Sequence, residues 1–293
     1  MLAGQTKSTW QQELRTLLIL GRVSNLPTVW SNCLAGWWLG GAGGGLRFVL
    51  ICLGASCLYI AGMFLNDAFD ADFDRQYRKE RPIPSGAISL SKVWGWGLGW
   101  LVAGVLMMSL ISEGAMVLAL LLAATILLYD AVHKAMVLAP LLMALCRFLL
   151  YLLASSGAVH GITGLTIWSG LALAIYIVGL SYLARRESAR GPVRYWPAWL
   201  LLAPVLQAWV VNAGEYKVRA LFLSVLFGAW VVHRLRDVYW SSTISVGRTV
   251  SGLLAGICLV DLLLVGGGNG LTASAFVGCF VASLLAQRLV PAT

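Results

Sequence analysis

The chain has 293 residues, 59% of them hydrophobic and only 11% charged, with a formal net charge of +9. This composition excludes an ordinary water-soluble domain, and the continuous apolar runs argue against a β-barrel, whose strands alternate in polarity. It predicts an all-α polytopic membrane protein.

Apolar segments of about bilayer-crossing length follow one another along the whole chain. The predicted spans are 16–40, 46–65, 92–112, 115–132, 137–157, 164–184, 195–211, 217–235, 247–265 and 271–289. Because the segments around 195–235 are short, nine spans with one re-entrant or interfacial helix fit almost as well as ten. No linker interrupts the series, so residues 1–293 are predicted to form a single domain.

Basic residues are divided unevenly between the two sides of this predicted bundle. Arg47, Lys217 and Arg219 are the only ones in the odd-numbered loops, whereas the termini and the even-numbered loops hold nearly all the others. This positive-inside pattern predicts cytoplasmic termini in a cytoplasmic or inner membrane, with the functional site open to the cytoplasmic side. The positive charge therefore sets topology, and nucleic acid is not a predicted partner.

The stretch NDAFDADFDRQYRKERPIPSG, residues 66–86, follows the second predicted span and contains five of the chain's 12 acidic residues, four of them aspartates within eight residues. If the helix continues beyond the span, its geometry places four oxygen-bearing side chains within an arc of about 100°. They are Asn66, Asp67, Asp70 and Asp74, whereas Asp72 points away. Carboxylates this close repel by about 3 kcal/mol per pair at an effective dielectric constant near 20. Such hard oxygen ligands predict a Mg²⁺ site; the alternative is a charged loop that merely ends the helix.

A basic run begins within the acidic stretch and includes Arg78 and Arg81, which beside a metal–carboxylate cluster would suit a diphosphate. Together with RPIPSG, the asparagine and the three aspartates resemble the first signature of the UbiA-type intramembrane prenyltransferases. The length and the number of spans are also similar to that family. Details such as YDAVHK and LARRE resemble its EboC-like members.

The resemblance implies a bundle of nine to ten transmembrane helices around a central cavity, with Mg²⁺ and an isoprenyl diphosphate at the cytoplasmic mouth. It implies that Asn66, Asp70 and Asp74 hold the metal and the diphosphate, with Asp67 in support. Asp70 and Asp74 are then catalytic, because the metal and the bases stabilise the departing diphosphate. The remaining allylic cation is attacked by the acceptor.

A second stretch, LYDAVHKAMVLAP at 128–140, resembles the family's tyrosine-then-lysine loop after the fourth span. The resemblance implies that Lys134 contacts the diphosphate in a catalytic role, with Tyr129 nearby and Asp130 and His133 as additions. From the residues alone, Lys134 is as easily explained by a lysine reaching the membrane surface.

Two polar residues inside predicted spans are candidate substrate contacts. The resemblance implies a polar, substrate-facing residue in the first span, and Asn25 is the candidate; hydrogen bonding between helices is the alternative. Arg147 lies within the fifth span, where an arginine suggests function. Its predicted partner is an aspartate of the cluster or the diphosphate, and a tether between helices is the alternative.

The stretch YIVGLSYLARRESARGPVR, 176–194, departs from the family, which has a second aspartate motif here. Its one acid, Glu187, is a candidate metal ligand. Arg185 and Arg186 are candidate diphosphate contacts, or only residues that set topology. The number of metal ions is therefore open.

Two kinds of function follow. The first is Mg²⁺-dependent transfer of an isoprenyl group from an isoprenyl diphosphate to an aromatic or other small or lipid nucleophile in the membrane. The alternative is a non-enzymatic isoprenoid or lipid binder or transporter that keeps the same fold. The D-G-x-x-A-R pattern of CDP-alcohol phosphotransferases is absent from the sequence.

Overall fold

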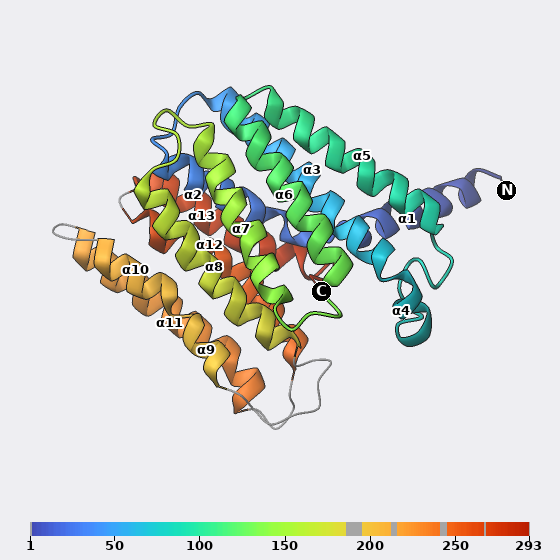
Figure 1. The fold of residues 1–293 in the computed structure, drawn as a ribbon. Helices are drawn as coiled ribbons and strands as arrows, with labels where there is room; N and C mark the ends of the chain where they lie inside the picture. The colour runs from blue at the N-terminus through green and yellow to red at the C-terminus, as the bar shows by residue number, and fades with distance from the viewer. Residues whose placement is uncertain (1, 186–194, 212–215, 241–244, 267, 293) are drawn as a thin grey trace.

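A computed structural model describes residues 2–185, 195–211, 216–240, 245–266 and 268–292, which form helices and no strand (Figure 1). In chain order the helices are α1 (Leu2–Leu20), the short 3-10 helix η1 (Val23–Asn25), α2 (Leu26–Leu39), α3 (Gly45–Phe69), α4 (Ala71–Tyr77), α5 (Leu90–Ser109), α6 (Glu113–Val132), α7 (Ala139–Ser156), α8 (Gly164–Ala184), α9 (Trp196–Leu200), α10 (Ala203–Val211), α11 (Lys217–Tyr239), α12 (Val246–Val265) and α13 (Gly270–Ala286).

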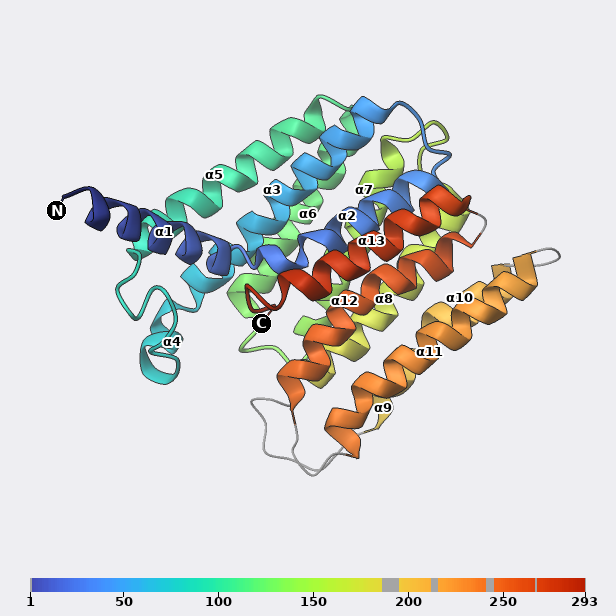
Figure 2. The same ribbon diagram turned by 180° about the vertical axis from the view of Figure 1, so that it is seen from behind.

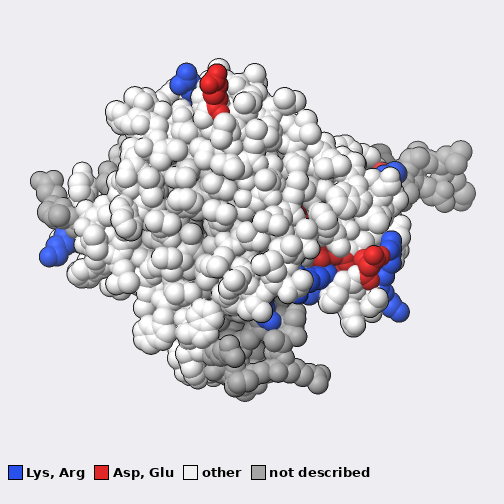
Figure 3. Space-filling view, viewed as in Figure 1, with Lys and Arg blue, Asp and Glu red and all other residues white. Residues whose placement is uncertain are grey.

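Most of these helices have the length and composition of membrane spans. Seven of them, α3, α5, α6, α7, α8, α11 and α12, are long and apolar enough to cross a bilayer, and 196–211 and 270–286 form shorter apolar helices. Figure 3 shows a broad face almost free of charge, with charged side chains gathered around α4. The prediction of an all-helical, multi-pass membrane protein is confirmed.

The first predicted span, 16–40, is not one continuous helix. α1 ends at Leu20, and Arg22 has the left-handed backbone conformation (φ 41°, ψ 47°). Pro27 stands in the first turn of α2, where it is tolerated because the amides there need no intrahelical partner. Inside a continuous helix the same proline would remove a hydrogen bond and collide with the preceding turn. The chain therefore breaks between the two helices.

Two apolar cores meet at the paired helices α2 and α7. One core fills the space between α2, α3, α5, α6 and α7, and the other lies between α2, α7, α8 and the helices α10 to α13. α2 and α7 contribute to both, and Gly36 lets them approach closely. A Cβ atom at Gly36 would lie 2.5 Å from the carbonyl oxygen of Tyr151 on α7.

We expect Gly36→Val to destabilise the bundle by about 1–3 kcal/mol, because the added side chain overpacks this contact. Gly99→Val on α5 is the matched control, since a Cβ at Gly99 meets no atom within 4 Å. The midpoint of thermal unfolding in detergent, followed by size-exclusion chromatography, should fall for the first variant only. Equal midpoints would contradict the role of this contact.

Figures 1 and 2 show that the end of α3, α4 and the loop between α6 and α7 lie at the same end of the bundle, with the turn between α2 and α3 at the opposite end. The fold thus brings the acidic stretch and the lysine loop to one mouth.

Candidate active site at the end of α3

The acidic stretch continues as a helix beyond the apolar part of α3. The amide of Asp70 donates to the Asn66 carbonyl and that of Asp74 to the Asp70 carbonyl, so helical bonding runs from α3 into α4. The four side chains predicted to share a face are all buried: Asn66, Asp67, Asp70 and Asp74. The side chain of Asp72 is 91% exposed and pairs only with Arg75. The predicted division of the motif into an inner and an outer face agrees with the structure.

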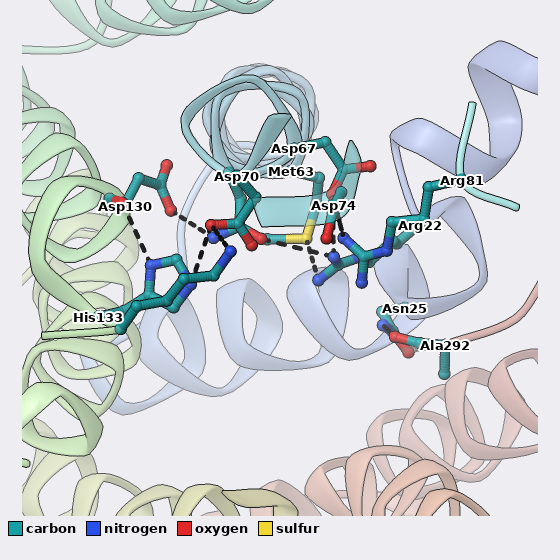
Figure 4. Close-up of polar contacts among 12 residues, drawn as sticks. Arg22, Asn25, Met63, Asp67, Asp70, Asp74, Arg81, Asp130, His133 and Ala292 are labelled. Carbon is teal, nitrogen blue, oxygen red and sulfur yellow. Dashed lines mark hydrogen bonds and ion pairs between the residues drawn. The ribbon is translucent and has the colours of Figure 1, made fainter. Parts of the chain in front are cut away.

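Two arginines from different parts of the chain neutralise one side of this cluster (Figure 4). Arg81 Nη1 lies 3.0 Å from Asp67 Oδ1 and 3.2 Å from Asp74 Oδ2. Arg22 Nη2 lies 3.2 Å from the same Asp67 oxygen. Arg81 comes from the RPIPSG turn, so that turn folds back onto the helix that precedes it.

The other side is neutralised by the loop after α6. Lys134 Nζ lies 2.7 Å from Asp70 Oδ1 and 3.8 Å from the centre of the Phe73 ring. His133 Nε2 lies 3.4 Å from the same carboxylate oxygen. Burial raises the pKa of Asp70, but its hydrogen bonds from His133 and Lys134 outweigh burial and hold that pKa below its ordinary value.

Asp130 on α6 also belongs to the site. Its Oδ1 accepts a hydrogen bond of 3.0 Å from Asn66 Nδ2. Because the amide nitrogen of Asn66 donates this bond, its amide oxygen faces away from Asp130 and towards Arg22. Sequence reasoning noted Asp130 only as an addition to the lysine loop, although an acid within a span is itself a signal of function.

Arg22 was not among the predicted site residues. Its backbone carbonyl accepts hydrogen bonds from the Tyr59 hydroxyl (3.3 Å) and from the backbone amide of Asn25 (3.0 Å). These bonds stabilise the left-handed backbone of Arg22. An arginine that precedes the S-N-L-P-T segment was the available signal.

These features belong to a known family. A family model described as the UbiA prenyltransferase family matches residues 24–290. The chain belongs to this family.

Two proteins named digeranylgeranylglyceryl phosphate synthase are similar to part of this UbiA family member. The protein from Methanothrix thermoacetophila is 32% identical over 118 residues, which cover 40% of this chain and 44% of the relative. The protein from Methanopyrus kandleri is 31% identical over 117 residues, covering 40% and 43%. The matched stretch spans less than half the length of either relative.

Solved structures resemble this UbiA member over most of its length. A UbiA homologue from Archaeoglobus fulgidus bound to GPP and Mg²⁺ has a TM-score of 0.65 at 15% identity, covering 91% of this chain and 99% of that one. The apo structure of a UbiA homologue from Aeropyrum pernix K1 has a TM-score of 0.64 at 16% identity, covering 84% and 98%. At these identities the likeness shows the shared fold.

The other predicted contacts in this UbiA member lie at different distances from the cluster. Tyr129 stacks on the ring of His133, with centroids 5.1 Å apart. Asn25 Nδ2 donates to the Ala292 carbonyl at 3.0 Å, and its oxygen is buried without a partner among the described residues. Arg78 ends α4 and makes no ion pair within the described part of the chain. The predicted substrate contacts of all three stay predictions.

Arg147 corrects one prediction about partners. It does not meet an aspartate of the cluster; its guanidinium donates to Asn32 Oδ1 at 2.7 Å and to Thr28 Oγ1 at 3.1 Å, both on α2. The physical reason is depth. Arg147 lies about two helical turns after the start of α7, so its side chain meets α2 inside the bundle and not the aspartates at the mouth.

The anion nearest to this arginine network is Asp261 on α12, which the sequence analysis missed. Asp261 is fully buried and accepts hydrogen bonds from Asn32 Nδ2 (2.8 Å) and from the hydroxyl groups of Ser31 and Tyr151. Asn32 therefore bridges Arg147 and Asp261. A lone aspartate in an apolar span was the available signal.

The segment that departs from the family is only partly described. Arg185, which ends α8, donates to backbone carbonyl groups of the loop between α6 and α7 rather than to a carboxylate. Arg186 and Glu187 lie outside the described residues, so their predicted roles stay predictions.

Proposed function

We propose that the protein transfers an isoprenyl group from an isoprenyl diphosphate to a nucleophilic acceptor in the membrane, with Mg²⁺ as cofactor. One observation supports this above all: a buried cluster of carboxylates at the end of a membrane helix, faced on two sides by arginine and lysine. Burying acids and bases together at a mouth is costly, and the combination suits a metal–diphosphate substrate.

The cluster has the chemistry to hold Mg²⁺, since it offers carboxylate oxygens and an amide oxygen. Asp74 Oδ1 and Asp130 Oδ2 are buried without a hydrogen-bond partner among the described residues. Burial also raises the pKa of Asp74, an effect that Arg81 only partly offsets. Within the described ranges no three acidic, histidine or cysteine side chains form a ready-made metal site, and bases contact one oxygen of each of Asp67, Asp70 and Asp74.

Substrate binding therefore involves an exchange of ion pairs. The diphosphate attracts Arg22, Arg81 and Lys134, which releases the carboxylate oxygens for the metal. Asn66, Asp67, Asp70 and Asp74 are the proposed ligands. When bound, Mg²⁺ neutralises charge that develops on the departing diphosphate. The three bases stabilise the same charge and need little reorganisation, because they already lie at the mouth.

The comparisons guide the choice of substrates. A structural neighbour is bound to GPP and Mg²⁺, which suggests an isoprenyl diphosphate donor. Partial relatives are named digeranylgeranylglyceryl phosphate synthases, so a glyceryl phosphate lipid is the first acceptor to test and an aromatic acid the second. The positive-inside pattern supports a site on the cytoplasmic side.

We expect the wild-type protein in lipid nanodiscs to bind labelled isoprenyl diphosphates with Mg²⁺ and to lose that binding in EDTA. The panel should run from ten-carbon to long polyprenyl donors, with binding and diphosphate release measured with and without each acceptor. Donor-dependent release that stops in EDTA would support transfer. Binding that persists in EDTA without release would favour the isoprenoid carrier, and no binding of any donor would overturn the proposal.

A further inference from the structure

The guanidinium of Arg185 forms an unusual set of hydrogen bonds with one loop. It donates to the carbonyl oxygens of Met136 at 2.6 Å, His133 at 2.7 Å and Val137 at 2.9 Å. The hydroxyl of Tyr182, one turn earlier on α8, donates to the same Val137 oxygen at 3.2 Å. Two side chains of α8 thus bind the backbone that follows α6.

These carbonyls belong to a segment that has few other partners. α6 ends at Val132, so the carbonyls that Arg185 binds lie beyond the helix, and among the described residues only that of Met136 has a further backbone donor, the amide of Ala139 at 3.4 Å. Residues 134–138 are exposed and form no regular helix. A planar guanidinium holds several acceptors in a fixed arrangement, which a flexible and strongly hydrated ammonium group does not. Arg185 therefore connects three carbonyls of this loop to the end of α8.

The same loop carries the two groups that face Asp70. Lys134 Nζ lies 2.7 Å and His133 Nε2 3.4 Å from its Oδ1. The side chain of Lys134 is 36% exposed, so its packing alone does not fix it. A continuous series of contacts leads from Arg185 through the His133 carbonyl and the loop to Lys134 and then to Asp70.

We propose that Arg185 is a positioning residue: it holds the loop between α6 and α7 so that Lys134 and His133 face the diphosphate site. This rests on the proposed function for its catalytic consequence. It assigns Arg185 an indirect role in place of the direct diphosphate contact that the sequence predicts, since both terminal nitrogens of its guanidinium already donate to the loop.

The first test is independent of activity. Hydrogen–deuterium exchange of residues 134–138 in nanodiscs is expected to be faster in Arg185→Gln than in the wild type, and trypsin should cut more readily after Lys134. Arg219→Gln is the matched control, because Arg219 donates to the Gly268 carbonyl in a different loop, after α12. Unchanged exchange in Arg185→Gln would overturn the proposal, even if no donor turns out to bind.

The second test asks whether Arg185 acts through Lys134. Arg185→Gln should slow diphosphate release by about tenfold, whereas the same change in a Lys134→Gln background should have less than about a twofold effect, the non-additivity expected of residues acting through one another. Arg185→Lys, which keeps the charge but not the planar fork, should lose nearly as much as Arg185→Gln. If the losses of the two single variants multiply in the double variant, or if Arg185→Lys is fully active, Arg185 contacts the diphosphate directly and the proposal is contradicted.

Discussion

Asp70→Asn is expected to abolish Mg²⁺-dependent binding of an isoprenyl diphosphate, whereas Asp72→Asn should leave it unchanged. Asp70 is buried and shared between Lys134 and His133, but the side chain of Asp72 is 91% exposed and pairs only with Arg75. Losing a group that stabilises developing charge slows catalysis by about 10²–10³-fold, so diphosphate release should fall by at least that factor. Donor binding and diphosphate release can both be measured with a labelled donor and protein in nanodiscs, once with Mg²⁺ and once with EDTA.

The pair of variants separates position from charge, since each removes one carboxylate from the same nine-residue motif. Equal losses would mean that the net charge of the mouth matters rather than the inner face of the helix. Normal binding in Asp70→Asn would show that the donor does not use this cluster.

The second large effect is expected on stability. Asp261→Leu removes the acceptor for three hydrogen bonds and leaves Arg147 without its nearest anion. Hydrogen bonds between membrane helices average only about 0.6 kcal/mol, but a buried charge without a counter-charge costs on the order of several kcal/mol, and Arg147 is linked to Asp261 through Asn32. The charge should therefore decide the outcome, with a clear fall in the thermal unfolding midpoint.

A double variant tests which effect dominates. If uncompensated charge is the cause, Asp261→Leu with Arg147→Met should be more stable than the sum of the single losses allows. Additive losses would instead attribute the effect to the hydrogen bonds. Ser169→Ala is the control, because the Ser169 hydroxyl is buried and has no partner among the described residues.

The part of the site that could be predicted is the part encoded by local spacing. Helical geometry alone places Asn66, Asp67, Asp70 and Asp74 on one face, and the structure agrees because α3 and α4 continue each other through Asp70. The bundle itself follows from the apolar spans. The role of these four residues as metal ligands stays a prediction.

What could not be predicted depends on contacts between distant helices. Arg22 reaches Asp67 only because the chain breaks before α2, and a hydropathy pattern shows no such break. Arg185 follows an apolar helix like any residue that sets topology, and only the fold places its guanidinium against the loop of Lys134. Charge pattern identified Arg185 but not what it touches, and it did not single out Arg22.

The network around Asp261 also has a consequence for biosynthesis. Tyr151 and Asp261 are 110 residues apart, so α2 and α7 are made well before α12 supplies their shared acceptor. Until then Arg147 lacks the nearest anion among the described residues, and α12 must itself carry an acid whose insertion costs about 2.5–3.5 kcal/mol. The centre of the bundle is therefore completed late during translation. A nascent chain halted before α12 would present a lone intramembrane arginine to the machinery that removes unassembled proteins.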